Sequence, residues 1–137
     1  MFGSLGAVSA VLSAVNQKAE ELKRRTRRFA LDVITLVRTF PRAPEADIVG
    51  WQLIKAATGV AANYRSTCRA RSHAEFVARI GVVLEEADES EFWLDVTWET
   101  ELSRSAEARR LWDESGQLRA IFSTANLTAR SRSEASR

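Results

Sequence analysis

The chain has 137 residues, 45% of them hydrophobic and 28% charged, and a formal net charge of +2. This length fits one domain with its own core, and six glycines and two prolines are few for a fold with many turns, so long helices are favoured over strands. The single cysteine, Cys68, excludes an internal disulfide, and no Cys/His spacing resembles a zinc site. We therefore expect a reducing, cytoplasmic location.

Residues 1–15 are mildly apolar, but they lack a basic start and are diluted by glycine and serine. We expect neither a cleaved signal nor a membrane span there, and no membrane partner. The segment is interpreted as flexible or as an extension of the first helix.

The first predicted helix spans about 16–40, because its apolar residues recur at steps of three, four or seven. These residues are Leu22, Phe29, Val33, Leu36 and Phe40. Pro41 and Pro44 bracket a short connection, since proline cannot continue a helix and favours its first turn. A second helix is predicted over about 44–69, and its run of small residues at 56–62 allows a neighbouring helix to approach closely.

The sequence Ser-His-Ala-Glu at Ser72 to Glu75 is a capping box, which predicts that the third helix starts there. That helix covers about 73–100, and a fourth covers about 104–128. The tail, 129–137, is rich in serine and arginine and is predicted to be disordered. Residues 16–128 thus form one all-α domain, an antiparallel up-down-up-down four-helix bundle.

Six basic residues crowd one part of the first helix. They are Lys18, Lys23, Arg24, Arg25, Arg27 and Arg28. Such a patch attracts phosphates by releasing counterions, without reading bases. It is the candidate site for RNA, DNA or an acidic partner, and the alternative is a solvated helix surface partly compensated by Glu20 and Glu21.

An acidic stretch from Glu85 to Glu101 could in principle hold a metal, because carboxylates four residues apart share a helical face. Di-iron bundles, however, need a Glu-x-x-His motif on each of two helices, and this chain has only His73. No Ser/His/Asp or Cys/His arrangement can be assembled either. We therefore expect no enzyme, no metal and no cofactor, and a carboxylate-based metal enzyme stays as the least favoured alternative.

The acidic third helix of one subunit could instead pair with the basic second helix of the next, which would fix the register of an assembly. Asn63 is interpreted as a register-setting amide and Tyr64 as a core or interface aromatic. Trp93, adjacent to Phe92, is interpreted as an interface aromatic, and the alternative is that the third helix has a broad core face. The full set of predicted interface or register residues is Asn63, Tyr64, Arg65, Arg69, Glu85, Glu86, Glu89 and Trp93.

The segments QLIKAATGVAANYRSTCRAR at 52–71 and SHAEFVARIGVVLEEADESEFWL at 72–94 resemble the bacterial 23S-rRNA intervening-sequence protein family. The resemblance covers about 29–127. The residues that carry it are Gln52, Leu53, Ala57, Asn63, Tyr64, Arg65, Glu75, Phe76, Glu85, Glu86 and Glu89. The first twenty residues and the Ser/Arg tail depart from the family's pattern.

The resemblance implies a four-helix bundle that assembles as a ring-like homopentamer and has no known catalytic reaction. A more distant similarity to the accessory variability determinant proteins of diversity-generating retroelements implies binding to nucleic acid and a reverse transcriptase. The leading hypothesis is a non-enzymatic homo-oligomeric scaffold or adaptor with a nucleic-acid-binding patch on its first helix. The alternative is a purely structural assembly.

Overall fold

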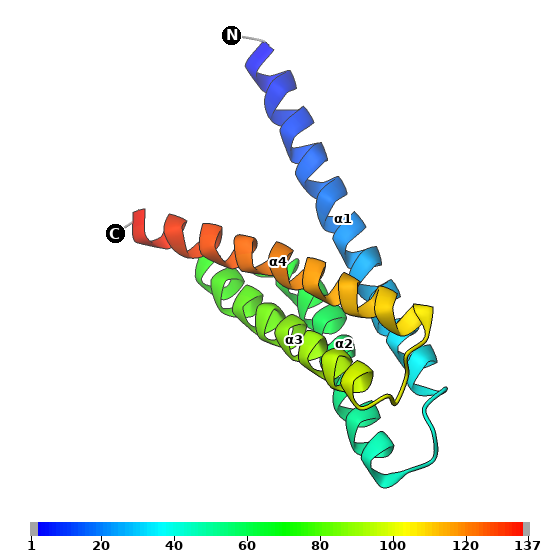
Figure 1. Cartoon of the computed structure of the whole chain (residues 1–137). Helices are drawn as coiled ribbons and strands as arrows, with labels where there is room; N and C mark the ends of the chain where they lie inside the picture. The colour runs from blue at the N-terminus through cyan, green and yellow to red at the C-terminus, as the bar shows by residue number, and fades with distance from the viewer. Residues whose placement is uncertain (1–2, 136–137) are drawn as a thin grey trace.

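The computed structural model describes residues 3–135, which form four α-helices and no strand (Figure 1). The predicted all-α class is confirmed. The helices are α1 (Gly3–Val37), α2 (Pro44–Thr67), α3 (His73–Glu99) and α4 (Ala106–Ala135). The bounds of α2 and α3 and the start of α4 lie close to those predicted from the prolines, the capping box and the apolar spacing.

The two chain ends differ more from the prediction. α1 begins at Gly3, so the segment before Asn16 extends the helix. α4 continues to Ala135, so the predicted disordered tail is wrong for residues 129–135. Tertiary contacts explain this end: Ala129 is buried, and the His73 ring donates from Nε2 to the Ala129 carbonyl at 3.0 Å. Residues 136–137 of the predicted tail lie outside the described chain.

The helices do not cover one another equally. α3 packs along both α2 and α4, whereas α1 packs mainly on α2 and only slightly on α4. Figure 1 shows the result: the N-terminal half of α1 projects away from the other three helices and diverges from the C-terminal half of α4. None of the helices within residues 3–135 is both long and apolar enough to cross a membrane.

The core lies where all four helices meet. Its largest fully buried side chains include Phe29 of α1, Leu53 of α2, Ile80 of α3 and Phe122 of α4. Burial of such side chains is the main favourable contribution to folding.

Serine and threonine hydroxyls are also buried in the core, and each bonds to a carbonyl one turn earlier on its own helix, so burial leaves none unpaired. These are Thr26, Thr67, Ser90, Thr97 and Ser115.

The start of α3 follows the capping-box prediction with one change. The Ser72 hydroxyl accepts a hydrogen bond from the Glu75 backbone at 3.1 Å, as expected. The Glu75 carboxylate accepts from the backbone N–H of Arg71, one residue before the cap, also at 3.1 Å. The two bonds pair backbone N–H groups at the start of α3 that have no partner within the helix. They therefore fix the residue at which α3 begins.

Phe122→Ala should destabilise the protein by about 3–5 kcal/mol, because it removes a fully buried ring whose centroid lies 5.4 Å from that of Tyr64. Urea unfolding at fixed protein concentration measures the change. Leu127→Ala on the same helix is the control: Leu127 is 66% exposed and its loss should change stability by less than about 0.5 kcal/mol. Equal effects of the two changes would contradict this core.

Candidate nucleic-acid and partner interface

The structure divides the predicted basic patch into residues that are paired and residues that are free. Arg25 is held by α4, with its Nη2 2.6 Å from Glu114 Oε1 and its Nε 2.8 Å from Glu114 Oε2. Lys23 pairs with Glu20 at 2.7 Å, and Arg28 with Asp32 at 3.5 Å. The patch therefore does not act as one surface.

The Arg25–Glu114 pair links α1 to α4 at a place where these helices make few other contacts. It is bidentate, and the Gln117 side-chain oxygen accepts a third bond from Arg25 Nη2 at 2.8 Å. The hydrogen bond that Arg25 donates to Glu114 raises the pKa of Arg25, so the charge is held firmly. Bidentate guanidinium–carboxylate pairs fix geometry as well as charge. Arg25 is thus a structural link between helices, and its guanidinium is not free for a phosphate.

Arg24 and Arg27 are exposed, and neither makes a side-chain hydrogen bond or ion pair with any other residue in 3–135. They edge a groove of about 400 Å³ between α1 and α2. Lys23 and, from α2, Arg65 complete the basic rim. The remaining lining consists of small residues: Ala30, Thr58, Ala61 and Ala62. The groove of α1 and α2 is therefore a shallow channel edged by four cations.

The sequence alone did not place Arg65 in this group, because its partners lie about forty residues away on another helix. We predicted it as an interface residue. The signal that could have placed it is the small-residue run at 56–62, since small side chains on α2 let α1 approach and bring Arg65 beside Arg24 and Arg27. The remaining residue of the patch, Lys18, lies outside the groove near the Tyr64 and Cys68 end of α2.

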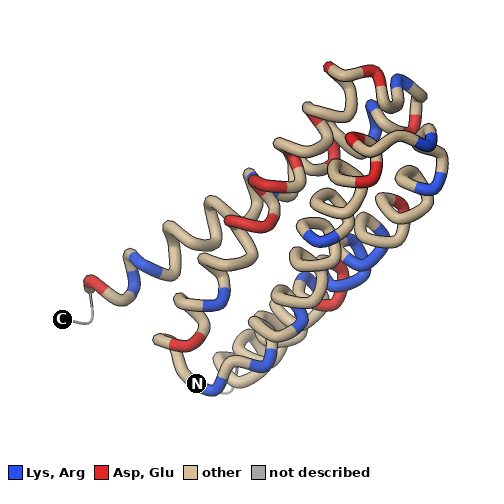
Figure 2. Tube along the Cα trace, turned by 90° about the horizontal axis from the view of Figure 1, so that it is seen from below, with Lys and Arg blue, Asp and Glu red and all other residues tan. Residues whose placement is uncertain are grey.

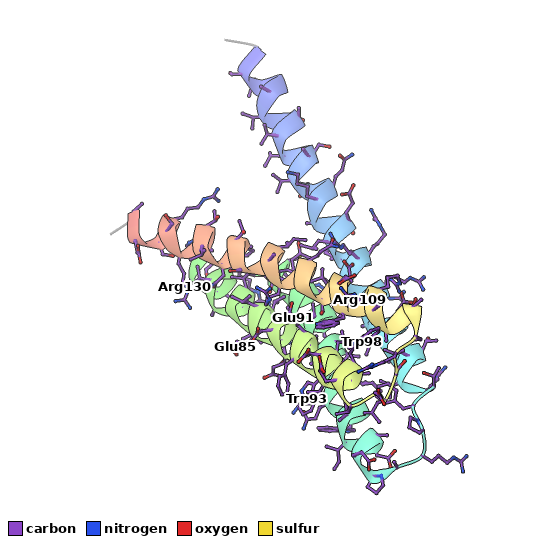
Figure 3. All side chains as sticks on the ribbon, in the orientation of Figure 1. Glu85, Glu91, Trp93, Trp98, Arg109 and Arg130 are labelled. Atoms are coloured by element: carbon purple, nitrogen blue, oxygen red, sulfur yellow. The ribbon has the colours of Figure 1, made fainter. Side chains whose placement is uncertain are left out.

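The predicted acidic face is also divided. Glu85 and Glu89 are exposed on α3, with no hydrogen bond or ion pair to another described side chain. Glu91, by contrast, pairs with Arg119 of α4 at 3.1 Å. Figure 2 shows the uneven distribution, with blue segments along one side of the bundle and red segments more frequent elsewhere. Figure 3 shows Glu85 and Glu91 projecting from α3.

Glu86 is half-buried between α3 and α2, beside Gly59. A Cβ at Gly59 would lie 2.7 Å from Glu86 Oε2, so a larger residue there would displace the end of this side chain. Burial raises the pKa of Glu86, the neighbouring Glu89 raises it further, and Lys55 opposes the shift. The small-residue run of α2 therefore accommodates a carboxylate at this point. Gly116 of α4 likewise lies beside a carboxylate of α3, since a Cβ there would be 2.9 Å from Glu91 Oε2.

The other predicted interface residues fall in different surroundings. Tyr64 is buried in the core, and burial raises the pKa of its hydroxyl. Asn63 is half-buried and donates to the Gly59 carbonyl of its own helix at 2.8 Å, so within 3–135 it links no two helices. Arg69 is exposed in the turn that follows α2.

Trp93 was predicted to lie at a subunit interface, but it packs against the core, and its neighbour Phe92 is the exposed ring of the pair, at 55%. The two rings meet edge to face at 4.9 Å. The broad core face of α3 explains this arrangement, because adjacent residues of a helix point about 100° apart. Phe92 is the more exposed of the two rings, and an interface role for the half-buried Trp93 stays a prediction.

A cluster of tryptophan and arginine at the α3–α4 turn was not predicted. The rings of Trp98 and Trp112 lie 6.1 Å apart, and Arg109 sits over both, 5.9 and 5.1 Å from their centroids (Figure 3). Arg104 lies 5.7 Å from the Trp98 centroid and donates to the Trp98 carbonyl at 3.1 Å. These contacts hold the turn together. No group of three or more His, Cys, Asp or Glu in residues 3–135 could hold a metal ion.

These features make the protein a small all-α protein built from four long helices, with charged grooves and faces on its surface. The chain belongs to the 23S rRNA-intervening sequence protein family, whose model matches residues 18–124. The family resemblance deduced from α2 and α3 is thereby confirmed. The match begins at Lys18, so most of the projecting part of α1 lies outside it.

A solved structure shares this fold. It is a protein of unknown function from the S23 ribosomal protein family of Bacteroides thetaiotaomicron, 22% identical, with a TM-score of 0.70. The similarity covers 77% of this chain and 97% of that one. None of the curated proteins matches the chain.

Glu86→Gln should stabilise the protein at neutral pH. The folded-state pKa of Glu86 lies above its ordinary value of 4.5, so the ionised carboxylate costs stability above the folded pKa, and the cost vanishes as pH falls through that window. We expect a gain on the order of 0.5 kcal/mol at pH 7, since solvent screens part of the charge, and none below pH 4.5. Urea unfolding across pH measures it, with Asp88→Asn on the exposed side of α3 as the control. A gain that persists unchanged at low pH would contradict the burial effect.

Proposed function

We propose that this protein is a non-enzymatic, cytoplasmic, homo-oligomeric scaffold or adaptor that binds a nucleic acid through the groove between α1 and α2. The observation that carries the proposal is the basic rim of that groove, where Arg24 and Arg27 of α1 meet Arg65 of α2. Membership of a family named for 23S rRNA intervening sequences makes RNA the first partner to test. Duplex DNA and a nucleic-acid-processing protein such as a reverse transcriptase come next.

The groove suits a phosphate backbone for a physical reason. Arginines on two different helices present planar donors from both sides, while the alanine floor lets a backbone approach without collision. Such contacts position a nucleic acid but carry no sequence information. The groove offers cations and small side chains, a combination that suits the binding of a polyanion.

Self-assembly is the second part of the proposal. We propose that up-down-up-down subunits form a ring-like homopentamer in which the acidic face of α3 meets a basic face of the next subunit. Glu85 and Glu89 on α3 and Arg69 in the α2–α3 turn are exposed and have no side-chain partner within residues 3–135. Opposite charges of this kind select register and partner more than they add affinity. The alternative function is a purely structural assembly, in which a neighbouring subunit also covers the basic groove and leaves it unavailable to a nucleic acid.

Neutralising the groove should weaken RNA binding and reduce its salt dependence. The variant is Arg24→Gln with Arg27→Gln, and gel shifts or anisotropy with a structured RNA at several salt concentrations measure binding. Loss of two phosphate contacts should lower the slope of log K against log salt by about 2.

Arg38→Gln with Arg42→Gln is the matched control for that experiment, because it removes the same charge from exposed positions at the end of α1 and in the α1–α2 connection. If both variants lose affinity equally, overall charge and not the groove drives binding. RNA binding that ignores salt and both variants would remove nucleic acid from the proposed function.

A charge exchange tests the assembly. The proposed pentamer has five times the subunit mass of 15.3 kDa, about 76 kDa, and light scattering after size exclusion should report it. Glu85→Lys with Glu89→Lys should lower the mass, because like charges then face each other across the interface. Adding Arg69→Glu, which leaves the groove unchanged, should restore part of it. A wild-type monomer, or a mass unchanged by the first exchange, would contradict the proposed interface.

A further inference from the structure

The projecting part of α1, residues 3–17, exposes an apolar stripe that the rest of the described chain, up to residue 135, leaves uncovered. We call this segment the arm. Its large apolar side chains are 55–72% exposed: Leu5, Val8, Val11, Leu12 and Val15. On a helix these five residues fall on one face. Figure 1 shows the arm standing clear of α4 and beyond the end of the α2–α3 turn.

The stripe continues the seam that α1 buries in the core. Thr26, Phe29, Val33 and Leu36 alternate at steps of three and four, and all four are buried. The same alternation, followed toward the N-terminus, passes through Leu22 and Ala19, which are half-buried. It then reaches Val15, Leu12, Val8 and Leu5 without a break in the heptad frame.

The bundle covers this seam only as far as the base of the arm. There Val15, Ala19 and Leu22 line a groove of about 430 Å³ together with Tyr64, Cys68 and Phe76 from the α2 and α3 side. Beyond that groove the seam has the form of a helix-packing surface without the helix that would pack on it.

The composition of the arm indicates what covers the stripe. Residues 3–17 contain no charged side chain, so copies of the arm can lie side by side without repulsion. Leucine occupies the a positions, 5 and 12, and β-branched valine the d positions, 8 and 15, a pattern that favours more than two strands. Val11 at position g widens the seam, as a multi-stranded bundle requires.

Two further observations favour copies of the chain over a lipid surface. In-plane membrane helices carry lysine or arginine on the polar face and aromatic residues on the other, and residues 3–17 have neither. The segment also has glycine, serine and valine at many positions, which are modest helix formers, so a helix of this length gains its stability from packing.

We propose that the arms of several copies of this chain associate in parallel, through the stripe of Leu5, Val8, Leu12 and Val15, into a short helical bundle at one end of the assembly. The inference deepens the proposed function and rests on its self-association, because a ring with rotational symmetry brings all arms to the same rim in parallel. It adds a contact surface outside the part of the chain that matches the family.

Disulfide trapping tests the arm contact directly. In a Cys68→Ser background, which removes the exposed native thiol, Leu12→Cys and Ala10→Cys are oxidised under identical mild conditions. Position 12 lies in the stripe and position 10 on the opposite side of the same helix turn. In a parallel bundle each a position meets its own copies, so Leu12→Cys should cross-link severalfold faster than Ala10→Cys. Val8→Cys, at a d position, should behave like Leu12→Cys.

The outcomes separate this inference from the proposed function. An assembly of high mass in which neither position cross-links, or both cross-link equally, would overturn the arm bundle and leave the ring intact. A monomer without cross-links would overturn both. Circular dichroism of each variant confirms that it is folded. Flotation with vesicles of phosphatidylcholine and phosphatidylglycerol provides the competing outcome, since vesicle binding lost in Leu5→Gln with Leu12→Gln, without cross-linking, would assign the stripe to a membrane surface.

Discussion

The packing of α1 against α2 determines most of what is distinctive in this molecule. α1 has 35 residues and α2 has 24, so at about 1.5 Å per residue α1 extends well beyond the helix that covers it. α4 contributes little cover, because it diverges from α1 toward its C-terminus. The overhang leaves an apolar seam exposed at one end, and the basic groove lies just inside the bundle, where α1 and α2 are still in contact.

Charged side chains have two distinct roles here, and geometry separates them. Arg25, Arg110 and Arg119 each reach a carboxylate on another helix, namely Glu114, Asp32 and Glu91. Such pairs hold α4 in position against α1 and α3. Three arginines without an ion pair to another described residue, Arg24, Arg27 and Arg65, instead meet at one groove. The net charge of the chain is close to zero, but the groove carries a local excess of positive charge, because the carboxylates that neutralise arginines lie elsewhere on the surface.

Local sequence patterns were sufficient for the existence and approximate limits of the helices, because prolines, the capping box at Ser72 and apolar spacing act within a few residues. They failed where tertiary contacts decide. Ala129 is buried by a contact with His73, fifty-six residues earlier, and a Ser/Arg-rich tail gives no local sign of that. Trp93 and Phe92 have similar chemistry, so only the packing of α3 determines which ring is covered. The six clustered basic residues all lie on α1, but the partner of Arg25 comes from α4, so the sequence could not show that Arg25 is paired while Arg24 is not.

The groove and the arm have related consequences if the subunits assemble as proposed. One groove presents only four cations, and so few phosphate contacts give weak binding at physiological salt. Repetition around a symmetric assembly changes this, because a long polyanion bound at one groove meets the next at high effective concentration. A bundle of arms would add to the assembly without using the charged surfaces, since residues 3–17 carry no charge. Self-association and polyanion binding would then occupy different parts of α1, and the first would strengthen the second.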